Sequence, residues 1–185
     1  MKRALLGFLG ALVLCFTAGA QQVFRTAGFE MALDGRGAIV GLINLESARN
    51  YAPPGRPGRL VRIRTVDGVE LEPAAVKTAG GLLTFAFEGG IELVVRAASK
   101  AGYLRFELVR AARPERIDAV LWGPIRTTIG ETIGEVVGVV RDAGFAIGIQ
   151  TLNAKTCGGQ LVNDEGTTGG VTTATPDGSG SSLQA

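Results

Sequence analysis

The sequence predicts an all-β fold, an antiparallel two-sheet β-sandwich followed by a flexible C-terminal tail. Three observations predict it. Apolar and polar residues alternate in short runs from Val23 to about Leu152, and turn-forming residue pairs that contain glycine separate these runs. In the same region no segment keeps helical spacing for three turns without a glycine or a proline. Residues 23–157 are therefore predicted to form one β-sandwich domain.

Residues 1–20 have the pattern of a secretory signal peptide. Lys2 and Arg3 precede an apolar run from Ala4 to Phe16, and Ala18-Gly19-Ala20 has the small residues of a cleavage site. The apolar run is shorter than the about 20 residues that span a bilayer. We therefore expect cleavage after Ala20. The product would be secreted or periplasmic, without a stable membrane span. A retained membrane anchor is the alternative.

The charge balance changes when this leader is removed. The chain has 19 Lys+Arg and 17 Asp+Glu, and loss of Lys2 and Arg3 leaves 17 of each. A formally neutral chain lacks the basic surplus that phosphate binding requires, so nucleic-acid binding is not expected. Cys15 leaves with the leader, so no internal disulfide is possible and Cys157 remains as a free thiol or as a link between chains.

Five runs along the chain have the two-residue period of a half-buried strand. In the first, Phe29, Met31 and Leu33 point to one face of the strand; in the second, Val61 and Ile63 oppose two arginines. The runs are FEMALD at 29–34, RLVRIRTV at 59–66, LLTFAFE at 82–88, IELVVRA at 91–97 and YLRFELVR at 103–110.

The connections between these runs favour hairpins. Glycine-containing pairs in 66–69 and 88–91 suit tight turns, and 34–37 and 99–102 are slightly longer versions. The pattern gives about nine strands, which are too many for one flat layer, so two packed sheets are expected. The segment 50–58 contains three prolines and is predicted to be an exposed connecting loop.

The stretch from Leu121 to Gln150 has two possible interpretations. Apolar residues and a capping-box pattern support a helix over 128–141, but three glycines four residues apart oppose it. The hairpin interpretation explains more, because Asp142-Ala143-Gly144 suits a three-residue loop between EVVGVVR and FAIGIQ. We therefore predict a turn or short helix at 127–131 and then a β-hairpin.

Residues 158–185 have the composition of a flexible tail or linker. Glycine, threonine, serine and aspartate dominate the segment, which has too little apolar area to offset the entropy of ordering it. We therefore expect either a complete small protein or the front part of a longer one.

Trp122, the only tryptophan, is the strongest single candidate for ligand contact. It comes at the end of a predicted strand, where the following Gly123-Pro124 pair cannot continue the ladder. Its ring either fills the core, the usual place for a large aromatic, or lies at a rim of the sheet where it could meet the flat face of a sugar. In the second case Arg126, Glu131 and Asn153 are the candidates that would orient the ligand by hydrogen bonding.

Several segments carry a resemblance to a known family. The matching features are Trp122-Gly123-Pro124 with Thr127-Thr128, the runs 135–142, 145–150 and 152–156, and earlier the patterns at 29–31, 37–39 and 50–51. Together they resemble the N-terminal galactose-mutarotase-like supersandwich region of large secreted bacterial proteins linked to polysaccharide breakdown. The resemblance covers most of 23–157 and implies a supersandwich fold. It carries over no catalytic residue, because the family's histidine acid is missing here and we expect the catalytic domain that would follow to be absent.

The residue inventory sets aside most catalytic chemistries. The chain contains no histidine, which removes Ser-His-Asp and Cys-His catalysis and the usual zinc sites, and it has no phosphate-cradling glycine motif, so neither a metal nor a cofactor is expected. Carboxylate pairs remain for sugar hydrolysis, Glu131 with Glu135 or Glu115 with Asp118, although a solvated face or loop is the commoner meaning of such pairs. The set Arg59, Arg62 and Arg64 is likewise interpreted as a solvated face.

The leading functional hypothesis is a secreted, noncatalytic, carbohydrate-associated β-sandwich module that binds sugar beside Trp122. A polysaccharide-processing protein that carries this module as its N-terminal part is one form of the hypothesis. The alternative is a structural or protein-interaction sandwich without a sugar site, whose partner is another protein domain. The third hypothesis is a self-sufficient glycosidase that uses paired acids.

Overall fold

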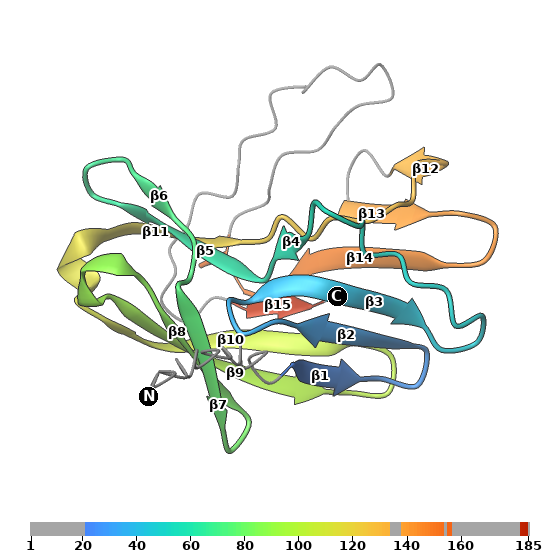
Figure 1. The fold of residues 1–185 in the computed structure, drawn as a ribbon, viewed down its shortest axis with the longest axis horizontal. Helices are drawn as coiled ribbons and strands as arrows, with labels where there is room; N and C mark the ends of the chain where they lie inside the picture. Colours follow the sequence, from blue (N-terminus) through green and yellow to red (C-terminus); the bar gives the residue numbers. More distant parts are fainter. Residues whose placement is uncertain (1–20, 134–137, 154, 157–181, 185) are drawn as a thin grey trace, which may run out of the picture.

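The computed structural model describes residues 21–133, 138–153, 155–156 and 182–184. These residues form fifteen β-strands and two single-turn 3₁₀ helices, with no α-helix among them (Figure 1). The all-β, antiparallel prediction is therefore confirmed. The predicted signal peptide at 1–20, Cys157 and residues 158–181 lie outside the described residues. Within the described part, no helix has the length and apolar character needed to cross a membrane.

The strands form three antiparallel sheets. The first has four strands in the order β1 (Gln22–Arg25), β2 (Phe29–Leu33), β3 (Ala38–Asn44) and β4 (Gly58–Arg59). The second has eight, in the order β12 (Thr132–Ile133), β13 (Gly138–Arg141), β14 (Ala146–Thr151), β15 (Ser182–Gln184), β10 (Leu104–Ala112), β9 (Glu92–Ser99), β8 (Leu82–Ala86) and β7 (Ala75–Ala79). The third has three, β11 (Ile117–Trp122), β5 (Val61–Thr65) and β6 (Glu70–Leu71). The two 3₁₀ turns are η1 (Glu88–Gly90) and η2 (Pro114–Arg116).

More strands are present than the about nine that alternation predicts. The additional ones include β4, β6 and β12, each of two residues, and β15, of three residues. A strand of two or three residues is too short to show a period of two, so side-chain alternation cannot reveal it.

The core lies between the four-stranded sheet and the long eight-stranded sheet and also includes Val61 and Ile63 of β5 and Val120 of β11. In Figure 1, β1, β2 and β3 lie in front of β9 and β10, and Phe24 of β1 meets Phe106 of β10 edge to face, with ring centroids 5.7 Å apart. Met31 and Leu33 of β2 and Leu93 of β9 are fully buried in the same cluster. Burial of the alternate side chains on facing strands is the main stabilising contribution of such a sandwich.

The predicted hairpins are present. β5 pairs with β6 across the turn that contains Gly68, and β8 pairs with β9 across η1. Gly68 has φ +83°, and Gly89 and Gly90 have φ +74° and +72°. These are left-handed conformations that glycine adopts at little cost, which is why the turns need it.

The stretch from Leu121 to Gln150 follows the hairpin interpretation. β13 and β14 pair antiparallel, with Arg141 opposite Ala146, and the Asp142 N–H donates to the Phe145 carbonyl at 2.9 Å. The predicted turn or short helix at 127–131 is an irregular loop with a bend at Thr128. Residues 134–137, which include the start of the predicted EVVGVVR strand at 135–141, lie outside the described residues.

The predicted exposed loop at 50–58 is wrong at both ends. Gly58 is buried and begins β4, and the start of the segment is buried as well. Tyr51 and Ala52 are buried, with 2% and 8% of their surface exposed. Asn50 forms a bridge to Ile43, and the Tyr51 N–H donates to the Leu42 carbonyl at 2.7 Å. The three prolines all follow Ala52, so they prevent strand pairing only after the chain has already added an extended segment alongside β3.

The C-terminal segment also differs in part from the predicted tail. Residues 182–184 form β15, which lies between β10 and β14 in the eight-stranded sheet. Side-chain composition gives no sign of this, because the strand is held by backbone pairing on both of its edges.

Gly58 is a point of close backbone approach between distant segments. A Cβ at this position would lie 2.4 Å from the Pro124 carbonyl oxygen and 2.8 Å from the Arg126 nitrogen. The Arg59 N–H donates to the same Pro124 carbonyl at 3.0 Å, so this hydrogen bond holds the two segments together. The contact fixes the loop that follows β11 against β4.

We predict that Gly58→Ala destabilises the protein by about 1–3 kcal/mol, because the added methyl group meets backbone that cannot rotate away. Gly102→Ala is the matched control, since nothing lies within 4 Å of a Cβ at Gly102. The control should stay within about 0.5 kcal/mol of wild type in urea unfolding. Equal urea midpoints for the two variants would contradict the close approach.

Candidate functional site

The four residues predicted to contact a ligand lie on or next to the loops that follow β11 and β14. Trp122 is the last residue of β11; it is partly buried and packs against the core. Arg126 and Glu131 are exposed on the loop between β11 and β12. Asn153 is exposed after β14, where its side-chain oxygen accepts the Lys155 N–H at 3.0 Å. The packing of Trp122 favours the core interpretation for much of its surface.

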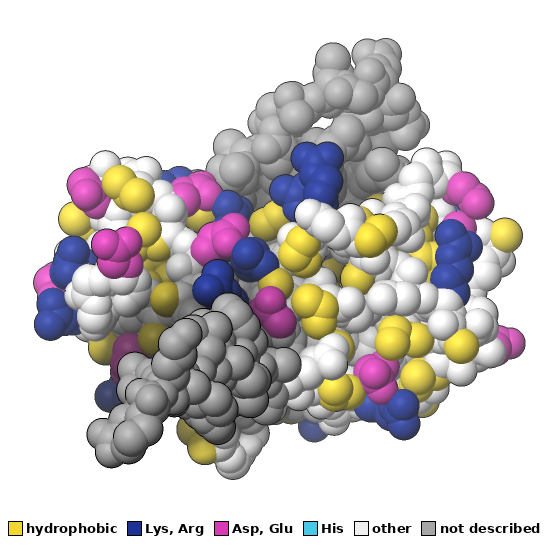
Figure 2. Space-filling model, viewed as in Figure 1, with side chains coloured by type: hydrophobic (Ala, Val, Ile, Leu, Met, Phe, Trp, Pro, Cys, Tyr) yellow, Lys and Arg dark blue, Asp and Glu magenta, His cyan; other side chains and the backbone are white. Residues whose placement is uncertain are grey.

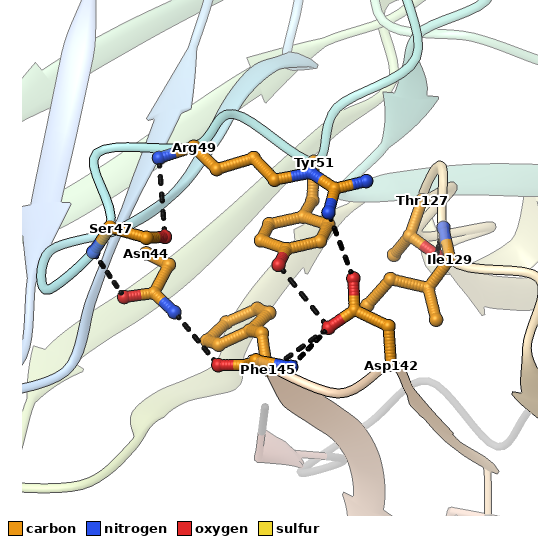
Figure 3. Close-up of polar contacts among 9 residues, drawn as sticks. Asn44, Ser47, Arg49, Tyr51, Thr127, Ile129, Asp142 and Phe145 are labelled. Carbon is orange, nitrogen blue, oxygen red and sulfur yellow. Dashed lines mark hydrogen bonds and ion pairs between the residues drawn. The ribbon is translucent and has the colours of Figure 1, made fainter.

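A different group of residues, far apart in the sequence, converges on the β13–β14 turn (Figure 3). Its centre is Asp142, the first residue of the predicted hairpin loop. One carboxylate oxygen accepts the N–H groups of Gly144 at 2.9 Å and Phe145 at 2.8 Å, which closes the turn. Aspartate commonly makes such hydrogen bonds to the backbone two residues further on.

Arg49 and Tyr51 approach the same carboxylate from the segment between β3 and β4. The Arg49 guanidinium lies 3.2 Å from one Asp142 oxygen, and the Tyr51 hydroxyl donates to the other at 3.3 Å. The Asp142 side chain is only 6% exposed, so this pair is better shielded from water than an ordinary surface ion pair. The interaction ties together segments about 90 positions apart in the sequence.

An aromatic stack extends this group into the core. The Tyr51 ring stacks on Phe145 with centroids 4.9 Å apart, and Phe145 meets Phe29 edge to face at 6.5 Å. The Arg49 guanidinium lies 4.6 Å from the centroid of the Tyr51 ring. Such contacts add to the stability gained by burying the rings and fix their orientation.

Asn44 makes the second connection between β3 and the turn. Its amide nitrogen donates to the Gly144 carbonyl at 3.2 Å, and its oxygen accepts the N–H groups of Glu46 at 2.8 Å and Ser47 at 3.3 Å. The residue is buried, with 5% exposure. A buried amide needs these partners, because an unsatisfied one would be costly.

Beside this group lies a shallow, open hollow of about 430 Å³, here called the Phe145 hollow. It lies where three turns meet, those after β1, after β3 and after β13. Its lining includes Ala27, Asn44, Glu46, Phe145 and Ala146. Glu46 is exposed, and its carboxylate has no partner among the described residues. Among the described residues that line the hollow, Glu46 is therefore the charged group that is available to a ligand.

The surroundings shift two titratable groups of the network in opposite directions. Hydrogen bonds from the Gly144 and Phe145 N–H groups, with help from Tyr51 and Arg49, hold the pKa of Asp142 below its ordinary value. Burial raises the pKa of Tyr51, and the hydrogen bond to the Asp142 carboxylate raises it further. Asp142 is therefore ionised and Tyr51 neutral at physiological pH.

The predicted arginine face is present, and it is neutralised by acidic partners. Arg59 pairs with Glu72 at 2.7 Å, Arg64 with Asp118 at 2.7 Å, and Arg62 with Glu70. Figure 2 shows basic and acidic side chains next to one another on the molecular surface. These pairs are partly exposed, and their main consequence is that the face carries little net charge.

The structure gives no support to a hydrolytic role for the carboxylate pairs considered above. Asp118 is occupied by Arg64, and Glu115 lies in η2. Glu131 is exposed, and Glu135 lies outside the described residues. No group of three or more His, Cys, Asp or Glu suited to a metal ion occurs in the described part of the chain.

The sequence holds a partial signal for this network. Asp142-Ala143-Gly144 predicts a turn, and Asn50-Tyr51 belongs to the pattern that carries the family resemblance, but nothing in the sequence connects the two. Tyr51 is next to a proline-rich segment, which favoured an exposed position. Long-range pairing of this kind has no local sequence signature.

We predict that the Tyr51 ring contributes more to stability than its hydroxyl. Tyr51→Ala should lower the melting temperature by about 10 °C or more, because it opens a cavity against Phe145. Tyr51→Phe keeps the stack and should lower it by no more than about 3 °C. Calorimetry of the two variants separates the contributions, and an equal loss would contradict a role for the stack.

We predict that Asp142 makes the protein acid-sensitive. A carboxyl whose pKa is lower in the folded than in the unfolded state contributes stability above its unfolded pKa and loses it as the pH falls through the folded one. Stability should therefore fall as the pH drops below the ordinary value of 3.8. Asp142→Asn keeps a hydrogen-bond acceptor and removes the charge, so urea midpoints of this variant should change less over that range. Asp67, whose pKa is also lowered, leaves a residual pH dependence.

Comparisons with known proteins add no family to these observations. No family model, no curated protein and no solved structure matches this chain. The resemblance to galactose-mutarotase-like regions therefore stays a prediction from the sequence, and any function has to be argued from the chain's own residues.

Proposed function

We propose that the chain is a noncatalytic β-sandwich module of an exported, carbohydrate-associated protein, and that it holds a sugar in the Phe145 hollow. The observation that carries the proposal is the composition of the hollow, an aromatic side chain beside an amide and an available carboxylate. Carbohydrate sites commonly combine an aromatic surface with a few polar groups that fix orientation. The exported location rests on the pattern of residues 1–20.

Rigidity of the hollow supports the proposal. The Leu45 N–H donates to the Gly28 carbonyl at 2.9 Å, which joins two of the three turns. Asn44 and Asp142 fix the third turn through Gly144. A preformed site loses less entropy on binding than a mobile one, so a shallow contact surface is enough for weak, specific association.

The side chains of the hollow would divide the work of holding a sugar. The partly exposed Phe145 would contact the C–H face of a sugar ring, and the Glu46 carboxylate would accept hydrogen bonds from its hydroxyl groups. The amide of Asn44 is already bonded at both ends, so its main role is to hold the turn. Retention of the ligand without bond cleavage is the expected outcome.

A second candidate function is a purely structural or protein-interaction module. The observation that favours it is that Asn44, Arg49, Tyr51 and Asp142 all direct their polar atoms toward neighbouring parts of the same chain. The network would then serve to close one end of the sandwich, and the hollow beside it would have no ligand.

We predict that filling the hollow weakens sugar binding. Ala146 is exposed at the start of β14 and lines the hollow, so Ala146→Tyr should weaken binding of a glycan selected from a broad panel by about tenfold or more, a loss of about 1.4 kcal/mol. Ala79→Tyr, on the exposed edge strand β7, is the matched control and should bind like wild type. Calorimetric titration measures both.

Three outcomes distinguish the candidates. Loss of binding in Ala146→Tyr alone supports the hollow. A shift of Trp122 emission on adding sugar, with binding unchanged in Ala146→Tyr, would instead locate the site at the rim formed with Arg126, Glu131 and Asn153. Failure of wild type to bind any glycan of the panel would exclude the carbohydrate proposal and leave the structural one.

A further inference from the structure

The eight-stranded sheet contains a slot that a single short strand fills. β10 and β14 do not pair with one another, and β15 lies between them, antiparallel to both. On one side Leu183 is opposite Phe106 of β10, and on the other it is opposite Thr151 of β14. β10 and β14 therefore run parallel, about 10 Å apart, which is twice the spacing of neighbouring strands.

The strand in the slot is short compared with the strands that flank it. β15 has three residues, whereas β10 has nine and β14 has six. Few backbone hydrogen bonds therefore hold β15 in place. If it leaves, both flanking strands present unpaired N–H and C=O groups, and these groups require a new partner.

The chain has the length to deliver this strand elsewhere. Thirty residues, 152–181, separate Thr151 from Ser182, and a chain of that length spans up to roughly 100 Å when extended. This reach exceeds the size of one domain. The covalent connection is therefore compatible with entry of β15 into its own slot or into the slot of a neighbouring molecule.

We propose that the slot between β10 and β14 is a strand-acceptor site, and that it exchanges β15 with the same strand of a second copy of this chain. A second copy fits because its residues 182–184 have the sequence and register that the slot already accepts. Exchange of an identical element between protomers needs no new interface chemistry. The partner that this surface fits is thus an extended C-terminal segment in trans.

The experiment uses the full-length chain with Leu183→Pro and a fluorescent peptide of residues 178–185, GSGSSLQA. Proline lacks the N–H and is disfavoured in a central strand, so this variant empties its own slot. The peptide should bind the variant, seen as a rise in anisotropy, and bind wild type at least tenfold more weakly because its slot is filled. Leu183→Val keeps the N–H and should behave like wild type.

The same peptide with proline in place of leucine is the negative control. Equal binding of both peptides, or no binding to a folded Leu183→Pro chain, overturns the proposal. If circular dichroism shows that the variant does not fold, native mass spectrometry of wild type decides. The proposal then expects a dimer at high protein concentration that excess peptide dissociates, and a monomer throughout overturns it.

Discussion

Each strand of this protein has to pair its backbone groups along its edges while it turns alternate side chains toward one core. The facing strands satisfy the second condition with Phe24, Met31 and Leu33 on one sheet and Leu93 and Phe106 on the other. The first condition explains the short strands, because β4 and β6 add backbone pairs and little apolar area.

The Asp142 network meets the same requirements with side chains. The turn between β13 and β14 would otherwise leave N–H groups without partners, and Asp142 accepts two of them. Arg49 and Tyr51 then connect this turn to the segment after β3. The network thus joins the four-stranded sheet to one end of the long sheet, and it gives the neighbouring hollow a fixed shape.

The sequence predicts the fold class and most hairpins, because a period of two and glycines with positive φ are local signals. The alternation at 61–65 correctly placed Val61 and Ile63 inside and two arginines outside. Local signals could not place Tyr51, whose burial depends on Asp142 and Phe145 far along the chain. They also could not find β15, which pairs with strands more than thirty positions away. The candidate site was therefore only partly predictable, since the Phe145 hollow is formed by three separate turns.

The ion pairs on the three-stranded sheet have a consequence for how molecules of this protein meet in a crowded solution. Stacking another sheet flat against β5 and β6 would bury Arg62 with Glu70 and Arg64 with Asp118, and the dehydration of these charges would offset much of the attraction. This face therefore resists sheet-on-sheet aggregation while contributing almost no net charge. The ion pairs thus oppose aggregation through this face without giving it a net charge that would act over a long range.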